Sequence, residues 1–173
     1  MSRENVLLFL AEHGIAYEEA RHEAVFTMAD TAILDGRLPG SRCKNILVRN
    51  RDGSAVFLLV TPSFATLDLG SLGRKLMVGR LSLCSPDEML GLLGVTPGAM
   101  SPLALLADQE QRVRLLMDEE LRDVRQLQFH PMDNTATVVI EMEGFLRFVD
   151  CVGHTVEFVD LPFQGLKSSS LAT

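Results

Sequence analysis

The stretch "SRCKNILVRNRDGSAVFLLVTP", residues 41–62, decides how the chain is predicted to fold. It contains two apolar runs, residues 45–48 and 55–61, which are joined by the turn-forming segment "RNRDG". Apolar runs on either side of a short segment with Asp-Gly are typical of a β-hairpin. Lys44 precedes the first run and Arg49 follows it, although the chain is acidic overall. The sequence therefore predicts a hairpin whose first strand has cations at both ends.

Helix and strand patterns alternate on both sides of this hairpin, without a long linker. The clearest helix start is Ser85, because Pro86 follows it and Glu88 completes a capping box. The Gly/Pro-rich segment 95–106 is predicted as a loop. Apolar repeats predict further helices over residues 3–13, 67–76 and 142–152, and "TMAD", residues 27–30, predicts the start of one more.

Short strand patterns lie outside the hairpin as well. They are predicted at residues 16–21, 80–84, 113–118, 126–131, 136–141 and 155–160. The count of about seven strands and five helices in mixed order predicts an α+β fold with a mixed β-sheet flanked by helices. We expect a single domain over residues 1–165 and a flexible C-terminal tail over residues 166–173.

Composition and charge limit the possible functions. The 173-residue chain is 47% hydrophobic and 23% charged, which is typical of a globular domain with a full core. Its formal net charge is −7, which argues against binding DNA by neutralising the phosphates of a duplex. The cations of residues 42–49 can still contact a short, exposed anionic target.

Sequence motifs of the common catalytic centres are absent. The chain has no GxSxG, P-loop, GxGxxG or HExxH motif, and its three cysteines have neither CxxC nor Cys/His spacing. We therefore expect no disulfide framework, no metal site and no cofactor. The apolar stretch near the N-terminus is too short for a signal peptide or a membrane span, so a cytoplasmic protein without a membrane partner is expected.

Several polar or turn-forming residues interrupt the apolar patterns. Lys44 and Asn45 lie on the predicted hairpin, Gly98 and Pro102 bracket a loop, and His130 lies in "FHPMDNTAT". Each has an ordinary explanation, such as a solvated strand-end lysine, a hydrogen-bonded turn histidine, or glycine and proline that shape a turn. Taken one at a time, these residues do not establish a catalytic site.

Taken together, four segments resemble one family in order and spacing. They are "VFT" (25–27), "LPGSRCKNILVRNRDG" (38–53), "RLSLCSPDEMLGLLGVTPGAMSPLALLAD" (80–108) and "LQFHPMDNTATVVI" (127–140). The family is that of the YbaK-type aminoacyl-tRNA editing domains, and the most similar branch is that of the free-standing prolyl-tRNA editing proteins, which deacylate alanyl-tRNA(Pro). The resemblance covers roughly residues 5–162.

The resemblance implies a curved mixed sheet and a metal-independent hydrolase without a cofactor, which cleaves the aminoacyl ester at the 3′ end of tRNA(Pro). Such an enzyme corrects the errors of a synthetase whose pocket rejects alanine poorly. The pocket rejects it poorly because each methylene that the smaller amino acid lacks weakens its binding by only about 1–3 kcal/mol. The implied partners are the acceptor end of aminoacylated tRNA(Pro) and prolyl-tRNA synthetase. The implied catalytic residues are Lys44, Asn45, Gly98 and His130, the implied substrate pocket contains Phe26, Thr27, Pro102 and Asn134, and Arg49 and Arg80 are candidate tRNA contacts.

Three departures from the family pattern leave the substrate open. His22 is not followed by the proline that relatives often have, Gly70 replaces a lysine, and Leu103 replaces a phenylalanine beside the Gly98 loop. One alternative is therefore deacylation of a cysteinyl- or seryl-tRNA. Another is a module that binds tRNA or a synthetase and keeps the fold without catalysis.

Overall fold

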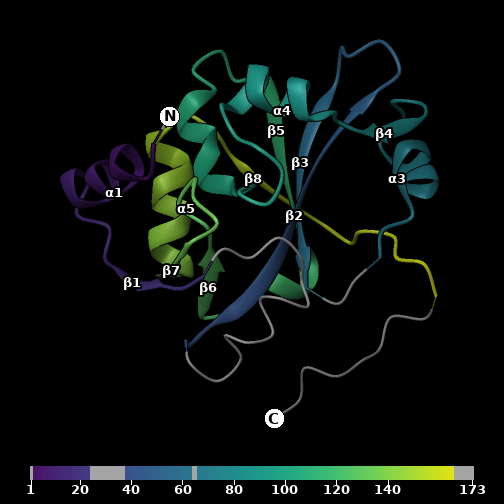
Figure 1. Cartoon of the computed structure of the whole chain (residues 1–173). Helices are drawn as coiled ribbons and strands as arrows, with labels where there is room; N and C mark the ends of the chain where they lie inside the picture. Colours follow the sequence, from purple (N-terminus) through teal and green to yellow (C-terminus); the bar gives the residue numbers. More distant parts are fainter. Residues whose placement is uncertain (1, 24–37, 64–65, 166–173) are drawn as a thin grey trace.

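The structure is a computed structural model and describes residues 2–23, 38–63 and 66–165. Its strands form a mixed sheet in the order β1-β7-β6-β2-β3-β5-β8, and β4 pairs with β2 outside this path (Figure 1). The predicted mixed α+β class is confirmed. The strands are β1 (Tyr17–Arg21), β2 (Ser41–Asn50), β3 (Val56–Pro62), β4 (Leu81–Leu83), β5 (Val113–Asp118), β6 (Gln126–Phe129), β7 (Ala136–Glu141) and β8 (Val156–Val159).

Four α-helices and two 3-10 helices accompany the sheet in the described residues. None of these helices is long and apolar enough to cross a membrane. The α-helices are α1 (Arg3–Glu12), α3 (Leu69–Lys75), α4 (Pro86–Leu93) and α5 (Met142–Cys151), and the 3-10 helices are η2 (Pro102–Ala107) and η3 (Glu119–Leu121).

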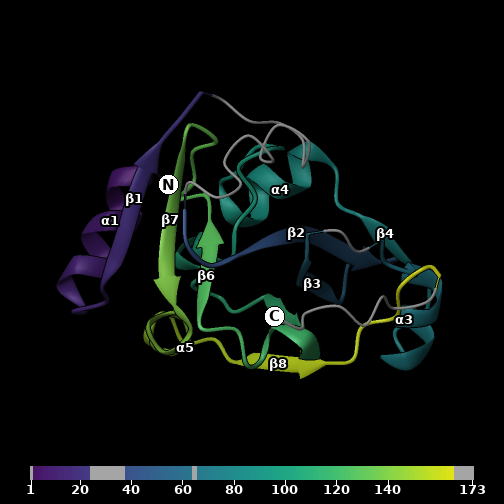
Figure 2. The same cartoon turned by 90° about the horizontal axis from the view of Figure 1, so that it is seen from below.

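Strand β2 runs across the middle of the molecule, from β6 at one end to β4 at the other (Figure 2). One edge pairs with β3 from Cys43 to Arg49. The other edge pairs with β6 only at Ser41 and Arg42, and with β4 only from Val48 to Asn50. Within the described chain, the β2 edge at residues 43–47 therefore lies between β6 and β4 without a partner strand, although at its end the Leu47 carbonyl accepts from the Cys84 N–H at 3.0 Å. We call this stretch the β2 slot.

Strand β3 is buried along its whole length. Its side chains alternate between two cores: Leu58 and Val60 belong to one cluster, and Phe57 and Leu59 belong to the other. A strand that is covered on both faces needs apolar residues at every position, because successive side chains point to opposite faces. This explains why the sequence shows a continuous apolar run rather than an alternating one.

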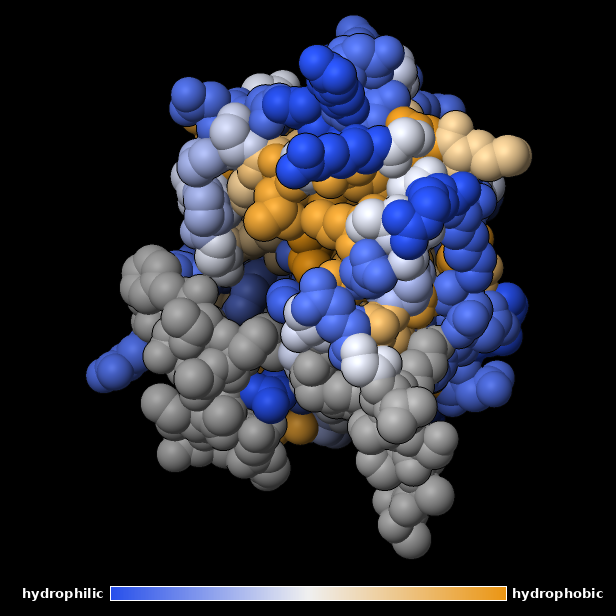
Figure 3. Space-filling model, turned by 90° about the vertical axis from the view of Figure 1, so that its right-hand side faces the viewer, coloured by the Kyte–Doolittle hydropathy of each residue, from blue (hydrophilic) through white to orange (hydrophobic). Residues whose placement is uncertain are grey.

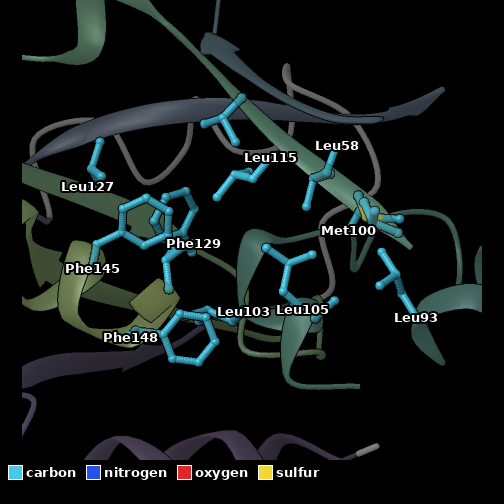
Figure 4. Packing of buried hydrophobic residues seen from close by; sticks show 14 of the residues in the cluster. Leu58, Leu93, Met100, Leu103, Leu105, Leu115, Leu127, Phe129, Phe145 and Phe148 are labelled. Carbon is cyan, nitrogen blue, oxygen red and sulfur yellow. The ribbon is translucent and has the colours of Figure 1, made fainter. Parts of the chain in front are cut away.

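The larger core lies between the sheet and helices α1, α4, α5 and η2. Phe145 and Phe148 of α5 pack there with Leu103 and Leu105 of η2 (Figure 4). The smaller core covers the opposite face of the sheet and includes Leu72 of α3. The loop that joins α4 to η2 is consequently on the side of the larger core.

The helix caps predicted from the sequence are confirmed. Ser85 Oγ accepts a hydrogen bond from the Glu88 N–H at 3.2 Å, and the Glu88 carboxylate accepts one from the Ser85 N–H at 2.7 Å. Gly94 closes α4 in the left-handed conformation, with φ of 66°. Ser2 likewise caps α1. These signals were predictable because each involves residues within one helical turn.

Two predicted boundaries were wrong. Strand β2 begins at Ser41 rather than at residue 45, because its first residues pair with β6. Segment 95–106 is not a loop throughout, because Ser101 Oγ accepts from the Leu103 N–H and caps the buried helix η2. The two hairpin strands and the six other strand patterns located in the sequence correspond to the eight strands of the sheet, so only the total of about seven was too low. The predicted helix at "TMAD", the pocket residues Phe26 and Thr27, and the tail 166–173 lie outside the described residues.

Candidate active site

Lys44 and Asn45 are neighbours in β2 but lie on opposite faces of the sheet. The side chain of Asn45 reaches the larger core, where its Nδ2 donates to the Met100 carbonyl at 3.2 Å. Lys44 is on the same face as Ile46 and Val48, which belong to the smaller core. The Lys44 side chain is half-buried, and among the described residues its ammonium has neither a hydrogen-bond nor an ion-pair partner. The cation is therefore available to an external anion.

The backbone of Asn45 faces the β2 slot. The Asn50 N–H donates to Ala55 across the hairpin, whereas the Cys84 N–H donates to Leu47 from the other edge. Because backbone groups of successive residues point to alternate edges, those of Asn45 point to the same edge as those of Leu47. No backbone partner of Asn45 is found on that edge in the described ranges. The slot therefore offers an N–H and a C=O to a ligand.

The loop from Gly98 to Pro102 lies beside Asn45. Gly98 has φ of 91°, which a residue with a side chain rarely adopts. Ser101 and Pro102 are buried at the start of η2, so they fix the end of the loop rather than line an open space. The hydrogen bond from Asn45 to Met100 holds the loop against β2.

His130 follows β6 directly and has a defined tautomer. Its Nδ1 lies 2.9 Å from the Ala136 carbonyl, which can only accept, so Nδ1 carries the proton and Nε2 keeps its lone pair. Burial lowers the pKa of His130 from its ordinary value, the hydrogen bond to Ala136 opposes this, and His22 lowers it further. The imidazole is therefore neutral at pH 7 and can accept a proton at Nε2.

His22 lies beside His130 although the two are far apart in the sequence. The ring centroids are 6.0 Å apart with the planes at 61°. His22 Nδ1 bonds to the Glu23 carbonyl at 2.8 Å, and its Nε2 lies 2.9 Å from the buried Thr137 hydroxyl. The sequence pointed to His22 only as part of a family pattern, because its position beside His130 depends on the pairing of β1 with β7.

Lys44 and His130 share one face of the sheet. Arg42 of β2 is the parallel partner of Gln128 in β6. Lys44 and His130 each lie two residues beyond this pair, and side chains two residues apart in a strand point to the same face. The structure thus places Lys44 and His130 on one side of the slot, and Asn45 with the Gly98 loop on the other.

Asn134 lies in the turn that connects β6 to β7, after His130. It is half-buried and has interactions of its own. The turn is fixed by Asp133, whose Oδ1 accepts from the Thr135 N–H and from the Thr135 hydroxyl, both at 2.8 Å. Asn134 therefore lies on a hydrogen-bonded turn, four residues after His130.

The two arginines predicted as tRNA contacts differ in their surroundings. Arg49 forms an ion pair with Glu88 and also donates to the Asn50 carbonyl at 3.2 Å, so it links β2 to the start of α4. The Ser85 N–H and Arg49 both lower the pKa of Glu88, with the Ser85 hydrogen bond as the larger cause. Arg80 is exposed and has no partner among the described residues. Only Arg80 is available without breaking an existing contact.

An apolar patch surrounded by hydrophilic residues is visible from the side that carries α3 and β4 (Figure 3). Two exposed hydrophobic residues belong to this part of the chain: Met77, which follows α3, and Leu83 of β4. Leu83 is 64% exposed and is the partner of Val48, the first β2 residue beyond the slot. Apolar surface therefore lies next to the slot.

Two of the three thiols are poor nucleophiles in their surroundings. Burial raises the pKa of Cys43 to about 12, and burial with Glu88 nearby raises that of Cys84 to about 11, so neither forms a thiolate at neutral pH. In the ranges that the structure describes, no group of three His, Cys, Asp or Glu residues is arranged to hold a metal ion. The chemical groups that the site offers are a lysine, a neutral histidine, an asparagine and backbone N–H groups.

Such a site, with a cation and hydrogen-bonding groups at an unpaired strand edge of a mixed sheet, is chemically suited to an anionic ligand. The sequence model of the aminoacyl-tRNA editing domain matches residues 22–148, and the chain belongs to this family. The matched range contains every site residue that was predicted from the sequence.

Individual relatives agree with this assignment. The chain is 29% identical over 160 residues to the prolyl-tRNA editing protein ProX of Acetoanaerobium sticklandii, which covers 92% of this chain and 98% of the relative. It is 32% identical over 149 residues to prolyl-tRNA synthetase associated domain-containing protein 1 of Bos taurus, which covers 84% of this chain and 86% of the relative.

Solved structures support the fold. A crystal structure of a candidate trans-editing enzyme for prolyl-tRNA synthetase is similar with a TM-score of 0.70, at 21% identity over 95% of this chain and 99% of the other. The crystal structure of hypothetical protein APE2540 is similar with a TM-score of 0.69, at 21% identity over 89% and 97% of the two chains.

Proposed function

We propose that the protein is a trans-editing hydrolase that removes alanine from mischarged alanyl-tRNA(Pro). The observation that carries this proposal is the Lys44 ammonium, which lacks a partner in the described chain and lies on one face of the β2 slot with His130. Membership of the aminoacyl-tRNA editing family supports the substrate class. The relatives named for prolyl-tRNA editing support the choice of tRNA(Pro).

Lys44 would hold the anionic end of the substrate. An ammonium is a compact cation with three donors, so it can bind the terminal phosphate and the ribose oxygens together. This would place the ester at the slot and convert an encounter in solution into a fixed geometry. Lys44 acts here by orienting the substrate and not as a base.

The chemical step is hydrolysis of an ester. The oxygen of a water molecule attacks the carbonyl carbon of the aminoacyl group, and backbone N–H groups of the Gly98 loop would stabilise the negative charge on the carbonyl oxygen. His130 Nε2 would accept the proton that the water loses. The bond between the carbonyl carbon and the ribose oxygen then breaks, the ribose oxygen takes a proton, and alanine and tRNA are released.

A small pocket would select alanine. Proline is larger, so a pocket that fits alanine excludes proline by steric clash, while the synthetase cannot exclude alanine in the same way. Leu103, which is fully buried in η2, packs behind the Gly98 loop and would set the depth of this pocket. Cysteinyl- and seryl-tRNA are the competing substrates, because their side chains are also small.

The proposal includes partners and conditions. The protein would bind the acceptor end of tRNA(Pro), assisted by Arg49 and Arg80, and prolyl-tRNA synthetase would deliver the mischarged tRNA. Deacylation would proceed without a metal ion or a cofactor. Activity that persists after prolonged treatment with a chelator is the expected result, and loss of activity that added Mg²⁺ or Zn²⁺ restores would refute metal independence.

The test is hydrolysis of alanyl-, cysteinyl-, seryl- and prolyl-tRNA(Pro) by the purified protein. We expect selective loss of alanine, and we expect Lys44→Ala to lower the rate by about 100-fold or more, because the ester is then no longer positioned. Arg147→Ala is the matched control, since Arg147 is an exposed cation on α5 at a distance from the slot. Full activity of Lys44→Ala would refute the assigned role. Binding of tRNA without hydrolysis of any of the four would favour a non-catalytic module.

A further inference from the structure

The side-chain amide of Asn45 has a nitrogen that donates a hydrogen bond and an oxygen that accepts none. Nδ2 donates to the Met100 carbonyl at 3.2 Å. Oδ1 is buried and has no hydrogen-bond partner, and it is the one buried side-chain atom in this condition within the described ranges. The orientation of the amide is fixed, because a carbonyl can only accept and so must face the nitrogen. The oxygen is therefore the end that lacks a partner.

A buried acceptor without a donor costs free energy, so it calls for an explanation. A donor that arrives with a ligand supplies one. Asn45 lies in the β2 slot and contacts the loop of Gly98, so its oxygen is next to the position proposed for the ester. Residues that hold a strained or unsatisfied group are typical of binding sites.

The two faces of β2 separate the two charges of an aminoacyl-tRNA end. Lys44, on one face, suits the negative phosphate end. On the other face, Asn45 Oδ1 is an acceptor without formal charge. An α-ammonium group has three donors and no acceptor, so it can satisfy this oxygen, whereas the ester oxygens cannot. A carboxylate at this position would also attract the ammonium, but it would repel the phosphate end and compete for Lys44.

We infer that Asn45 is a specificity-determining residue whose Oδ1 accepts a hydrogen bond from the α-ammonium of the aminoacyl group. Its Nδ2 meanwhile holds the Gly98 loop in place. The inference rests on the proposed function and adds to it a requirement of the substrate: the amino group must be present and unmodified. Peptidyl and N-acylated ends of tRNA would then be excluded by the loss of the ammonium.

The experiment compares two enzymes with two substrates. The enzymes are the wild type and Asn45→Leu, which has a similar volume and no polar atom. The substrates are alanyl-tRNA(Pro) and propionyl-tRNA(Pro), which differ only in the α-amino group. Each rate is divided by the spontaneous rate of the same ester, because the ammonium itself activates the carbonyl. The wild type should prefer the alanyl ester by about 10- to 100-fold, the usual effect of one charge-assisted hydrogen bond.

In Asn45→Leu, we expect this preference to vanish while both esters react slowly. If Asn45 only holds the loop or a water molecule, the substitution will slow both esters by the same factor, and that result overturns the inference while the proposed function stands. Lys44→Ala is the control, because it should lower both rates equally. A thermal melt verifies that Asn45→Leu is folded.

A binding measurement covers the case in which no hydrolysis is seen. Two stable amide analogues, 3′-alanylamino- and 3′-propionylamino-3′-deoxyadenosine, are titrated into the wild-type protein and followed by NMR. Tighter binding of the alanyl analogue supports the inference, and the preference should vanish in Asn45→Leu. Equal binding of both analogues by the wild type overturns it. Absence of hydrolysis with selective binding would refute the proposed function and leave the ammonium site in place.

Discussion

The two strands of the central hairpin differ in sequence and in burial: β3 is an almost continuous apolar run, whereas β2 carries three cations around a short apolar run. Strand β3 has a partner on each edge and all its side chains are buried. Strand β2 leaves one edge unpaired over the β2 slot, and there it carries the Lys44 ammonium and Asn45 Oδ1, neither of which has a partner in the described chain. The comparison shows how one hairpin combines a buried strand with polar groups: β3 is packed on both faces, and β2 carries the polar groups of the proposed site beside it.

Substitution in β3 should have the largest effect on stability. Leu58 is fully buried in the larger core, so Leu58→Ala should lower the free energy of unfolding by about 2–5 kcal/mol. Lys44→Ala, two positions from the centre of β2, should change it by less than about 0.5 kcal/mol, because the ammonium has no partner to lose. Urea unfolding of both variants measures the difference.

Equal destabilisation by the two substitutions would contradict this division between the strands. It would mean that Lys44 is part of the packing of the smaller core. Lys44→Met would then separate the two contributions, because methionine keeps the apolar part of the chain and removes the charge.

The same contrast explains which parts of the molecule could be predicted from the sequence. Strand β3 and helix α4 were predicted well, because an apolar run and a capping box are local signals. The start of β2 was wrong, because Ser41 and Arg42 pair with β6, which comes much later in the chain. The start of β2 pairs with a strand that is distant in the sequence, and its exposed face is cationic. The sequence of this segment alone therefore shows no strand pattern.

The candidate site was predicted from a family pattern rather than from geometry. The pattern located Lys44, Asn45, Gly98 and His130, but it did not show that Lys44 and Asn45 face opposite sides. It also did not show that His22 lies beside His130 or that Asn45 Oδ1 lacks a partner, since both depend on contacts between distant segments. Helix η2 was missed because its alanines and leucines follow a Gly/Pro-rich stretch that is typical of a loop.

His130 offers a pH test of the face of the sheet that it shares with Lys44. Burial holds its pKa below the ordinary value of 6.5, and His22 lowers it further, while Ala136 and Asp133 act in the opposite direction. NMR titration should therefore give a His130 pKa below 6.5, and His22→Ala should raise it. If His130 accepts a proton in the reaction, the acid limb of the pH-rate profile should lie below pH 6.5 and move with the same substitution.

The lowered pKa of His130 also makes the free energy of unfolding depend on pH. The unfolded state binds the proton more readily than the folded state, so the contribution of His130 to stability is complete above its unfolded pKa and is lost as the pH falls below that value. A measured His130 pKa at or above 6.5 would show that its surroundings are more open than the structure describes.

The smallest expected effect concerns the end of β2 beyond the slot, where Arg49 and Arg80 differ. Arg80 is exposed and without a partner in the described chain, so Arg80→Ala should leave the melting temperature unchanged. If Arg80 contacts the tRNA, the same substitution should lower the slope of log Kd against log salt for tRNA binding by about 0.7–0.9, which is the value for one phosphate contact. Arg49→Ala should lower the melting temperature slightly, because it removes the ion pair with Glu88, and any change of slope would show that Arg49 also reaches the tRNA. Unchanged slopes for both variants would mean that neither arginine contacts phosphate, so that the contact proposed for Lys44 would have to carry most of the electrostatic attraction.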